Sequence, residues 1–321
     1  MRACLYTGGE AAELPFPEGA QHFGRADLLW LHLDGRESDV RAWLSTQDDI
    51  PDVVRSALLA VETRPRCDVI GHGALINMRG LGKTPEDDPD ALVSLRFWAE
   101  KGRVISLSFR SPLSLDRVVR EFLDSKIKDP GDLLTAFATS STDDLDPEIA
   151  ALGDALDAIE VNLAGSGIYK IRRDVSALRS QAIHYRRFVV PQRQALEKLA
   201  TAPVNWLDEH DRMHLHEASD RFSRMAEELE AVRERAAIVH DELTDLHAEQ
   251  MDGRSLLLSI YALVFLPLTF VTGLFGMNVP IPYTDDPTAF WVITGGCILT
   301  VIVGIAWFLS KRWINRDGSV E

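Results

Sequence analysis

Residues 255–278 read SLLLSIYALVFLPLTFVTGLFGMN, and the first 21 of them, Ser255–Phe275, carry no charged side chain. A second uncharged segment, Phe290–Leu309, follows after a short loop. Because the hydrocarbon core of a bilayer is about 30 Å thick and needs about 20 helical residues, each segment is long enough to cross it. Buried helices of a soluble protein are the alternative, but two adjacent uncharged segments of this length favour membrane spans.

Basic residues flank these two segments at the ends that point away from the connecting loop. Arg254 precedes the first segment, and Lys311, Arg312 and Arg316 follow the second, whereas the loop over residues 276–289 has no Lys or Arg. Positively charged flanks stay in the cytoplasm. We therefore expect a multi-pass protein of the cell inner (cytoplasmic) membrane, with both termini cytoplasmic.

The composition of the chain is acidic. It has 34 Lys+Arg against 49 Asp+Glu, a formal net charge of -15. This argues against a nucleic-acid partner, because phosphate contacts need Lys and Arg. An acidic surface raises the local concentration of cations, although solubility alone also accounts for it. Cys4, Cys67 and Cys297 are scattered without a CxxC pattern, which suits a reducing cytosol and excludes a zinc-finger framework.

The chain divides into six parts by hydrophobic pattern. The fold class that we predict is an α+β cytosolic domain followed by long helices and two C-terminal transmembrane helices. The strand candidates are Leu28–Leu33, Ala74–Met78 and a hairpin over 91–110 that turns at Lys101-Gly102. The parts are a cytosolic α/β domain (1–145), a helical stalk (146–254), a first transmembrane helix (255–275), an extracytoplasmic loop (276–289), a second transmembrane helix (290–310) and a cytosolic tail (311–321).

A very long helix is expected from about Asp208 into the first membrane span, since no Gly or Pro intervenes before Gly253. Its length would be about 100 Å at 1.5 Å per residue, so it must pack against other helices or other copies. Heptad spacing gives it an apolar seam: Ala218, Phe222, Met225, Leu229, Val232, Ala236, Val239, Leu243 and Leu246.

The same helix carries a second stripe, acidic before the membrane and small or polar within it. Steps of three and four keep its members on one face. Such a face suits a narrow wet pore, and close packing of membrane helices is the alternative. One copy offers one wall, so a pore requires a homo-oligomer. The stripe consists of Asp241, Asp245, Ala248, Asp252, Ser255, Ser259, Ala262, Leu266, Thr269 and Gly273.

The outer end of the first span has chemistry suited to a hydrated cation. Gly276 lets the backbone leave the helix without a Cβ clash, and Asn278 offers a neutral carboxamide. A ring of such groups would hold a divalent cation such as Mg²⁺ through its water shell and still release it. We expect Asn278 to contact the ion in this way.

The Gly276-Met277-Asn278 motif at the end of a span resembles the CorA superfamily of two-span metal-ion transporters. Within it the chain looks more like the ZntB zinc-transport branch, in the segments WLHLD (30–34), TRPR (63–66), PQR (191–193) and FLPLTFVTGLFG (265–276). The loop VPIPYTDD (279–286) differs from the glycine-rich loop of some members of that branch.

The resemblance implies a homopentameric funnel whose first span lines the pore. It implies transport of Zn²⁺, or of Cd²⁺, Ni²⁺ or Co²⁺, with coupling to a proton gradient and without a cofactor. It also implies roles for Gly276, Met277, Asn278, Thr269 and Asp241, which match motif or pore positions. First-shell zinc sites use His and Cys, which the stripe lacks, so zinc would pass hydrated.

Other interpretations stay open. A Mg²⁺/Co²⁺ channel would use the same scaffold, and a membrane-anchored scaffold protein would use the coiled coil but not the polar stripe. Spacing indicates no Ser-His-Asp or paired-carboxylate constellation, so we do not expect an enzyme. His210, His214, His216 and Glu217 are a candidate cytosolic metal site, for which an exposed polar helix face is the alternative.

Overall fold

The computed structural model describes residues 1–22, 24–60, 64–83, 91–161, 167–277 and 287–314. The chain divides into two compact units, Met1–Asp241 and Glu242–Glu321. Each unit is considered by itself.

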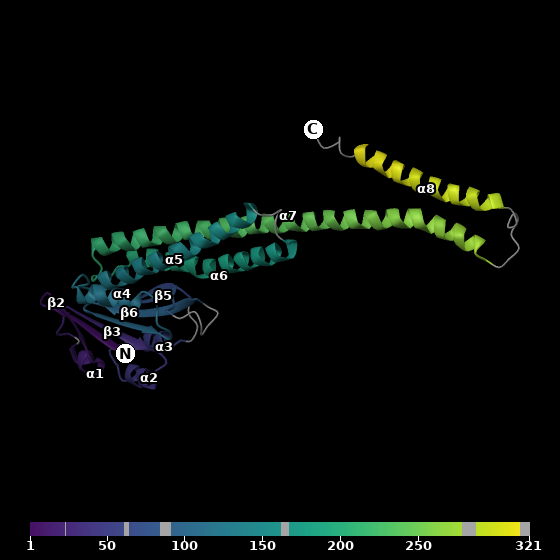
Figure 1. Cartoon of the computed structure of the whole chain (residues 1–321). Coiled ribbons are helices and arrows are strands. Elements are labelled where there is room, and N and C mark those ends of the chain that lie inside the picture. Colours follow the sequence, from purple (N-terminus) through teal and green to yellow (C-terminus); the bar gives the residue numbers. More distant parts are fainter. Residues whose placement is uncertain (23, 61–63, 84–90, 162–166, 278–286, 315–321) are drawn as a thin grey trace. The chain divides into compact units, whose positions relative to one another are not determined.

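The first unit contains one seven-stranded sheet in the order β2-β1-β3-β7-β6-β5-β4 (Figure 1). Neighbouring strands are antiparallel, except that β3 and β7 are parallel. The strands are β1 (Arg2–Thr7), β2 (Glu10–Leu14), β3 (Leu28–Asp34), β4 (Arg66–Ile70), β5 (Gly73–Leu81), β6 (Leu92–Glu100) and β7 (Arg103–Ser108).

Helices cover both faces of the sheet, so the central strands are buried on both sides (Figure 1). Successive side chains of a strand point to opposite faces. On β3, Leu29, Leu31 and Leu33 join the core that packs against α2 (Ser38–Ser45) and α3 (Asp52–Leu58). Trp30 packs against Phe122 and Phe137 on the other face. The sheet is also flanked by α1 (Phe16–Gly19), the short 3₁₀ helix η1 (Ala20–His22) and α4 (Leu115–Leu123).

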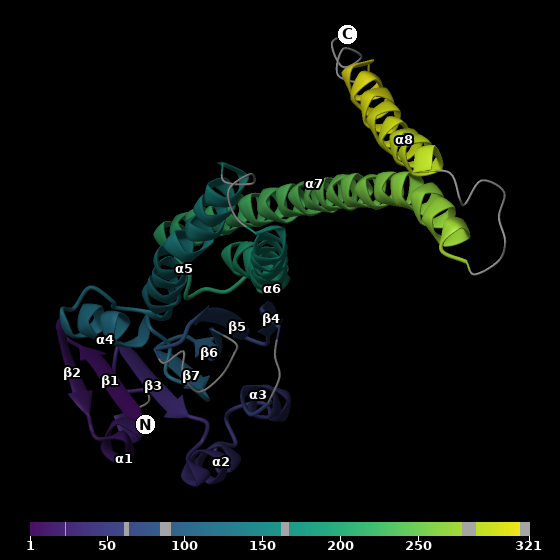
Figure 2. The same ribbon diagram turned by 45° about the vertical axis from the view of Figure 1, so that its right-hand side comes forward.

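Three helices of the first unit run side by side (Figure 2): α5 (Pro130–Val161), α6 (Ile168–Ala200) and the first part of α7 (Glu209–Phe275). Ion pairs join α5 to α7, among them Arg221 with Asp143 at 2.7 Å and Arg235 with Asp157. The proposed domain boundary at 145/146 falls inside α5, which passes through Pro147 without ending. Its buried face continues on both sides of that proline, at Leu145 and Ile149, and holds the helix together.

The predicted seam of the long helix is confirmed in the first unit. Its members there are at most 3 % exposed, from Ala218 to Val239. The α7 helix also begins where the sequence indicates, one residue after Asp208.

The second unit consists of the remainder of α7 and of α8 (Pro287–Ile314). An 18-residue window of α7 is apolar enough to cross a membrane, with a mean hydropathy of 2.1 and none of it buried. In α8, the apolar segment recognised among the described residues, Phe290–Gly304, is shorter.

Candidate ion pathway

The polar stripe of α7 is exposed along its whole length. In the second unit Asp245, Asp252, Ser255, Ser259 and Thr269 are all exposed. Leu266, the largest apolar member, is 70 % exposed. Asp241, Ala248, Ala262 and Gly273 are exposed as well, and Asp241 is the last residue of the first unit.

A different face of α7 packs against α8. Ile260, Val264 and Pro267 line a groove together with Leu299 and Val303 of α8. At 100° per residue, the centre of this face and the centre of the stripe lie about 130° apart around the helix. The stripe is therefore not used for packing against α8, and its small residues remain available to a pore or to another copy.

The hydroxyl groups of the stripe are oriented by the helix itself. Ser259 donates its hydroxyl proton to the carbonyl oxygen of Ser255 at 2.9 Å, and Thr269 donates to that of Phe265 at 2.7 Å. A hydroxyl that has donated its one proton can only accept further hydrogen bonds. The stripe thus presents oxygen lone pairs, which accept protons from the water shell of a cation.

The structure describes two residues of the Gly-Met-Asn motif. The α7 helix ends at Phe275, and the Gly276 N–H donates to the carbonyl oxygen of Thr272 at 2.9 Å. A Cβ on Gly276 would lie 3.2 Å from that oxygen, so a close approach explains the glycine; its φ is not in the left-handed region. Met277 is 54 % exposed. Asn278 lies outside the described residues, so its role stays a prediction.

The structure brings together part of the predicted histidine group. His210 and His214 approach each other, with 3.2 Å between their Nε2 atoms. Oε2 of Glu217 lies 3.7 Å from Nδ1 of His214. His216 is exposed but two positions from His214, and residues so spaced do not face each other on a helix.

Three carboxylates that the sequence analysis did not single out meet where α5 and α7 begin. Asp129, Asp208 and Asp211 have oxygens within 4.8 Å of one another. Asp211 N–H donates to Asp208 at 2.8 Å and Asp208 N–H donates to Asp211 at 3.1 Å, which is a reciprocal helix cap. Burial, and next the charge of Asp129, raise the pKa of Asp211 to about 7. Two acidic residues three positions apart at the start of a helix, Asp208 and Asp211, are the sequence signal that could have indicated this cap.

Three comparisons place this architecture among known proteins. The chain is 33 % identical over 315 residues to the zinc transport protein ZntB of Pectobacterium carotovorum subsp. carotovorum (strain PC1), which covers 95 % of each chain. It superimposes on the structure of the full-length CmaX protein with a TM-score of 0.78 and 29 % identity, covering 97 % of each chain. The fold is also that of the CorA magnesium transporter from Methanocaldococcus jannaschii, with a TM-score of 0.79, 17 % identity and 96 % of each chain covered.

The family described as CorA-like Mg²⁺ transporter protein matches residues 25–312, which is nearly the whole chain. The match includes the strands β3 to β7, the three-helix bundle and both C-terminal helices, whereas β1 and β2 lie before it. The resemblance inferred from the Gly-Met-Asn motif is thereby confirmed, and the chain belongs to the CorA-like Mg²⁺ transporter family.

Proposed function

We propose that this protein transports divalent metal cations across the cell inner membrane, with Zn²⁺ as its cargo. The observation that carries this proposal is the exposed stripe of α7, in which the Ser259 and Thr269 hydroxyls donate inward to the helix backbone. The choice of zinc is supported by similarity to a zinc transport protein over 95 % of the chain.

The stripe suits a cation that keeps its water shell. In the second unit it contains no His or Cys, the side chains that bind Zn²⁺ directly. Cation-bound waters are strong donors, and the outward lone pairs of Ser259 and Thr269 accept from them. The carboxylates of Asp241, Asp245 and Asp252 would attract cations electrostatically, and Asn278 would contact the hydrated ion at the far end.

One chain supplies one wall of such a path, so the function requires several copies. We propose a homopentamer in the lipid bilayer, with the stripes facing a common axis and both termini cytoplasmic. Cd²⁺, Ni²⁺ and Co²⁺ carry the same charge and fit the same path, and a proton gradient would drive the transport. A Mg²⁺/Co²⁺ channel is the second candidate, favoured by the intact Gly276-Met277 at the end of α7.

The matched pair Thr269→Val and Thr272→Val tests the role of the stripe. Both residues are exposed threonines that donate to the helix backbone. At 100° per residue, Thr269 lies about 40° from the centre of the stripe within the span, and Thr272 lies about 100° from it, outside the stripe. Valine keeps the shape and removes the oxygen. In proteoliposomes we expect Thr269→Val to lower Zn²⁺ flux several-fold and Thr272→Val to leave it near the wild-type rate. Equal flux in both variants would contradict the proposed path.

A further inference from the structure

The first turns of α7 hold two imidazole rings that converge outside the candidate ion pathway. The His210 and His214 Nε2 atoms are 3.2 Å apart, and the ring planes are inclined by 87°. His210 is exposed and the His214 side chain is 39 % exposed, so a dissolved ion can reach both rings. Two histidines at i and i+4 on one helix face are a recurrent zinc-binding arrangement.

The separation of the two nitrogens suits zinc. Zn–N bonds are about 2.05 Å long, and two such bonds that span 3.2 Å enclose an angle of about 100° at the metal, close to the tetrahedral value. The separation therefore allows one ion to bind both Nε2 atoms once the rings turn their lone pairs toward it. Water would complete the coordination.

Glu217 has a supporting position rather than a ligand position. Its Oε2 lies 3.7 Å from Nδ1 of His214, on the opposite side of the ring from Nε2. A carboxylate near the second nitrogen fixes the tautomer of a metal-binding histidine. At 3.7 Å the Glu217 carboxylate is within ion-pair distance but makes no hydrogen bond, and its negative charge favours the His214 tautomer with the proton on Nδ1. In that tautomer Nε2 of His214 keeps its lone pair and can accept the Nε2–H of His210.

Metal binding then requires a change of tautomer at His210, and both histidines stay neutral. The proton on Nε2 of His210 moves to Nδ1, and both Nε2 lone pairs bind the ion. The nearest cationic neighbour along this face, Arg221, is neutralised by Asp143 at 2.7 Å and Asp146 at 3.9 Å. Its charge therefore opposes cation binding only weakly.

We propose that His210 and His214 form a surface site for a borderline divalent cation, Zn²⁺ or Co²⁺, oriented by Glu217. Mg²⁺ is excluded because it takes oxygen ligands and sheds water reluctantly. The geometry defines the class of ion; zinc as the occupant in the cell rests on the proposed function.

Calorimetric titration of Zn²⁺ into the full chain in detergent tests the site, with Mg²⁺ in large excess to occupy carboxylates. We expect His210→Ala and His214→Ala each to remove one binding event, and Glu217→Gln to weaken it about tenfold. His216→Ala is the matched control, an exposed histidine two residues away, and should bind as the wild type does. The thermal unfolding midpoint of each variant shows whether it is folded. If His214→Ala is unfolded, the test rests on His210→Ala.

Unchanged Zn²⁺ binding in folded His210→Ala, or an equal loss in His216→Ala, would overturn the assignment. Flux in proteoliposomes is measured on the same variants. Binding at the histidines without any Zn²⁺ flux in the wild type would refute the transport proposal and leave this site standing. Zn²⁺ flux without the histidine-dependent binding event would refute the site alone.

Discussion

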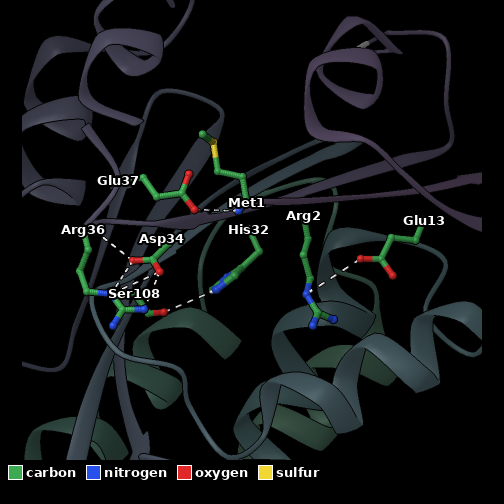
Figure 3. A network of polar contacts seen from close by, with 8 residues as sticks. All are labelled: Met1, Arg2, Glu13, His32, Asp34, Arg36, Glu37 and Ser108. Carbon is green, nitrogen blue, oxygen red and sulfur yellow. Dashed lines mark hydrogen bonds and ion pairs between the residues drawn. The ribbon is translucent and has the colours of Figure 1, made fainter. Parts of the chain in front are cut away.

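His32 is a buried histidine held neutral inside the sheet. It lies on β3, 6 % exposed, with its Nδ1 atom 2.8 Å from the Ser106 hydroxyl. Its Nε2 atom lies 3.5 Å from the Ser108 hydroxyl (Figure 3). Trp30 donates its indole N–H to the same Ser106 hydroxyl at 2.9 Å. Burial, and next the positive N-terminal amine, lower the pKa of His32 to about 4.

This lowered pKa predicts a loss of stability in acid. Between pH 6.5 and pH 4 the unfolded chain binds a proton at His32 that the folded chain does not. Stability is therefore unaffected by His32 above pH 6.5, falls by about 3 kcal/mol as the pH drops from 6.5 to 4, and falls no further at this group below pH 4. His32→Gln should lose less stability than wild type over this range, measured as the thermal unfolding midpoint in detergent. His72→Gln, at an exposed position, is the control, and an acid sensitivity of His32→Gln equal to wild type would contradict the assignment.

Single residues show what sequence spacing can and cannot predict. The i, i+4 spacing of His210 and His214 indicated that they share a helix face, because the helix period fixes it. It did not indicate the 3.2 Å between their nitrogens, which depends on side-chain rotamers. Glu217 was predicted among the metal-binding residues, and in the structure its carboxylate lies beside Nδ1 of His214, not beside the two Nε2 atoms.

At the scale of the elements, Gln192 joins α6 to the open edge of β5. Its side-chain oxygen accepts from the Arg79 backbone N–H at 2.6 Å, and its NH₂ donates to the Arg79 carbonyl at 2.9 Å. The β4–β5 pairing ends at Asn77, so the Gln192 amide continues it like one more strand residue. Gln192 is 1 % exposed.

Gln192→Met should therefore destabilise the first unit. The substitution keeps the length of the side chain but leaves a backbone donor and acceptor without partners, which costs about 2–4 kcal/mol for the two groups. The thermal unfolding midpoint should fall by several degrees. Gln194→Met, at an exposed position two residues along α6, should change it little. A similar small effect of both substitutions would show that the amide is not needed at this edge.

Elements with long apolar patterns were the predictable ones. The strand Leu28–Leu33, the hairpin through Lys101-Gly102 and the long helix match β3, β6–β7 and α7. Central strands buried on both faces read as continuous apolar runs. The edge strands β2 and β4 and the neighbouring strand β1 were not predicted, because their segments mix polar and apolar residues and are defined by pairing with neighbours. The helices α2 and α3 were not predicted either, since with 8 and 7 residues they are too short to show a clear helical period.

For the whole molecule, the sequence indicated the family more firmly than the site. The order of α/β domain, long helix, Gly-Met-Asn and second apolar segment predicted a CorA-like protein, and the match over residues 25–312 confirms it. The pathway could be predicted as a stripe, since helical period alone defines it. Its pore role depends on other copies of the chain, and the assembly in five copies stays a prediction.

The most direct test of the transport proposal is Zn²⁺ flux into proteoliposomes that contain the purified full chain. The measurement is repeated with excess Mg²⁺ and with an imposed pH gradient. We expect Zn²⁺ flux that persists in excess Mg²⁺, as the similarity to a zinc transport protein supports, and that responds to the gradient. Flux of Zn²⁺ that Mg²⁺ abolishes would contradict a zinc transporter and favour the Mg²⁺/Co²⁺ channel on the same fold.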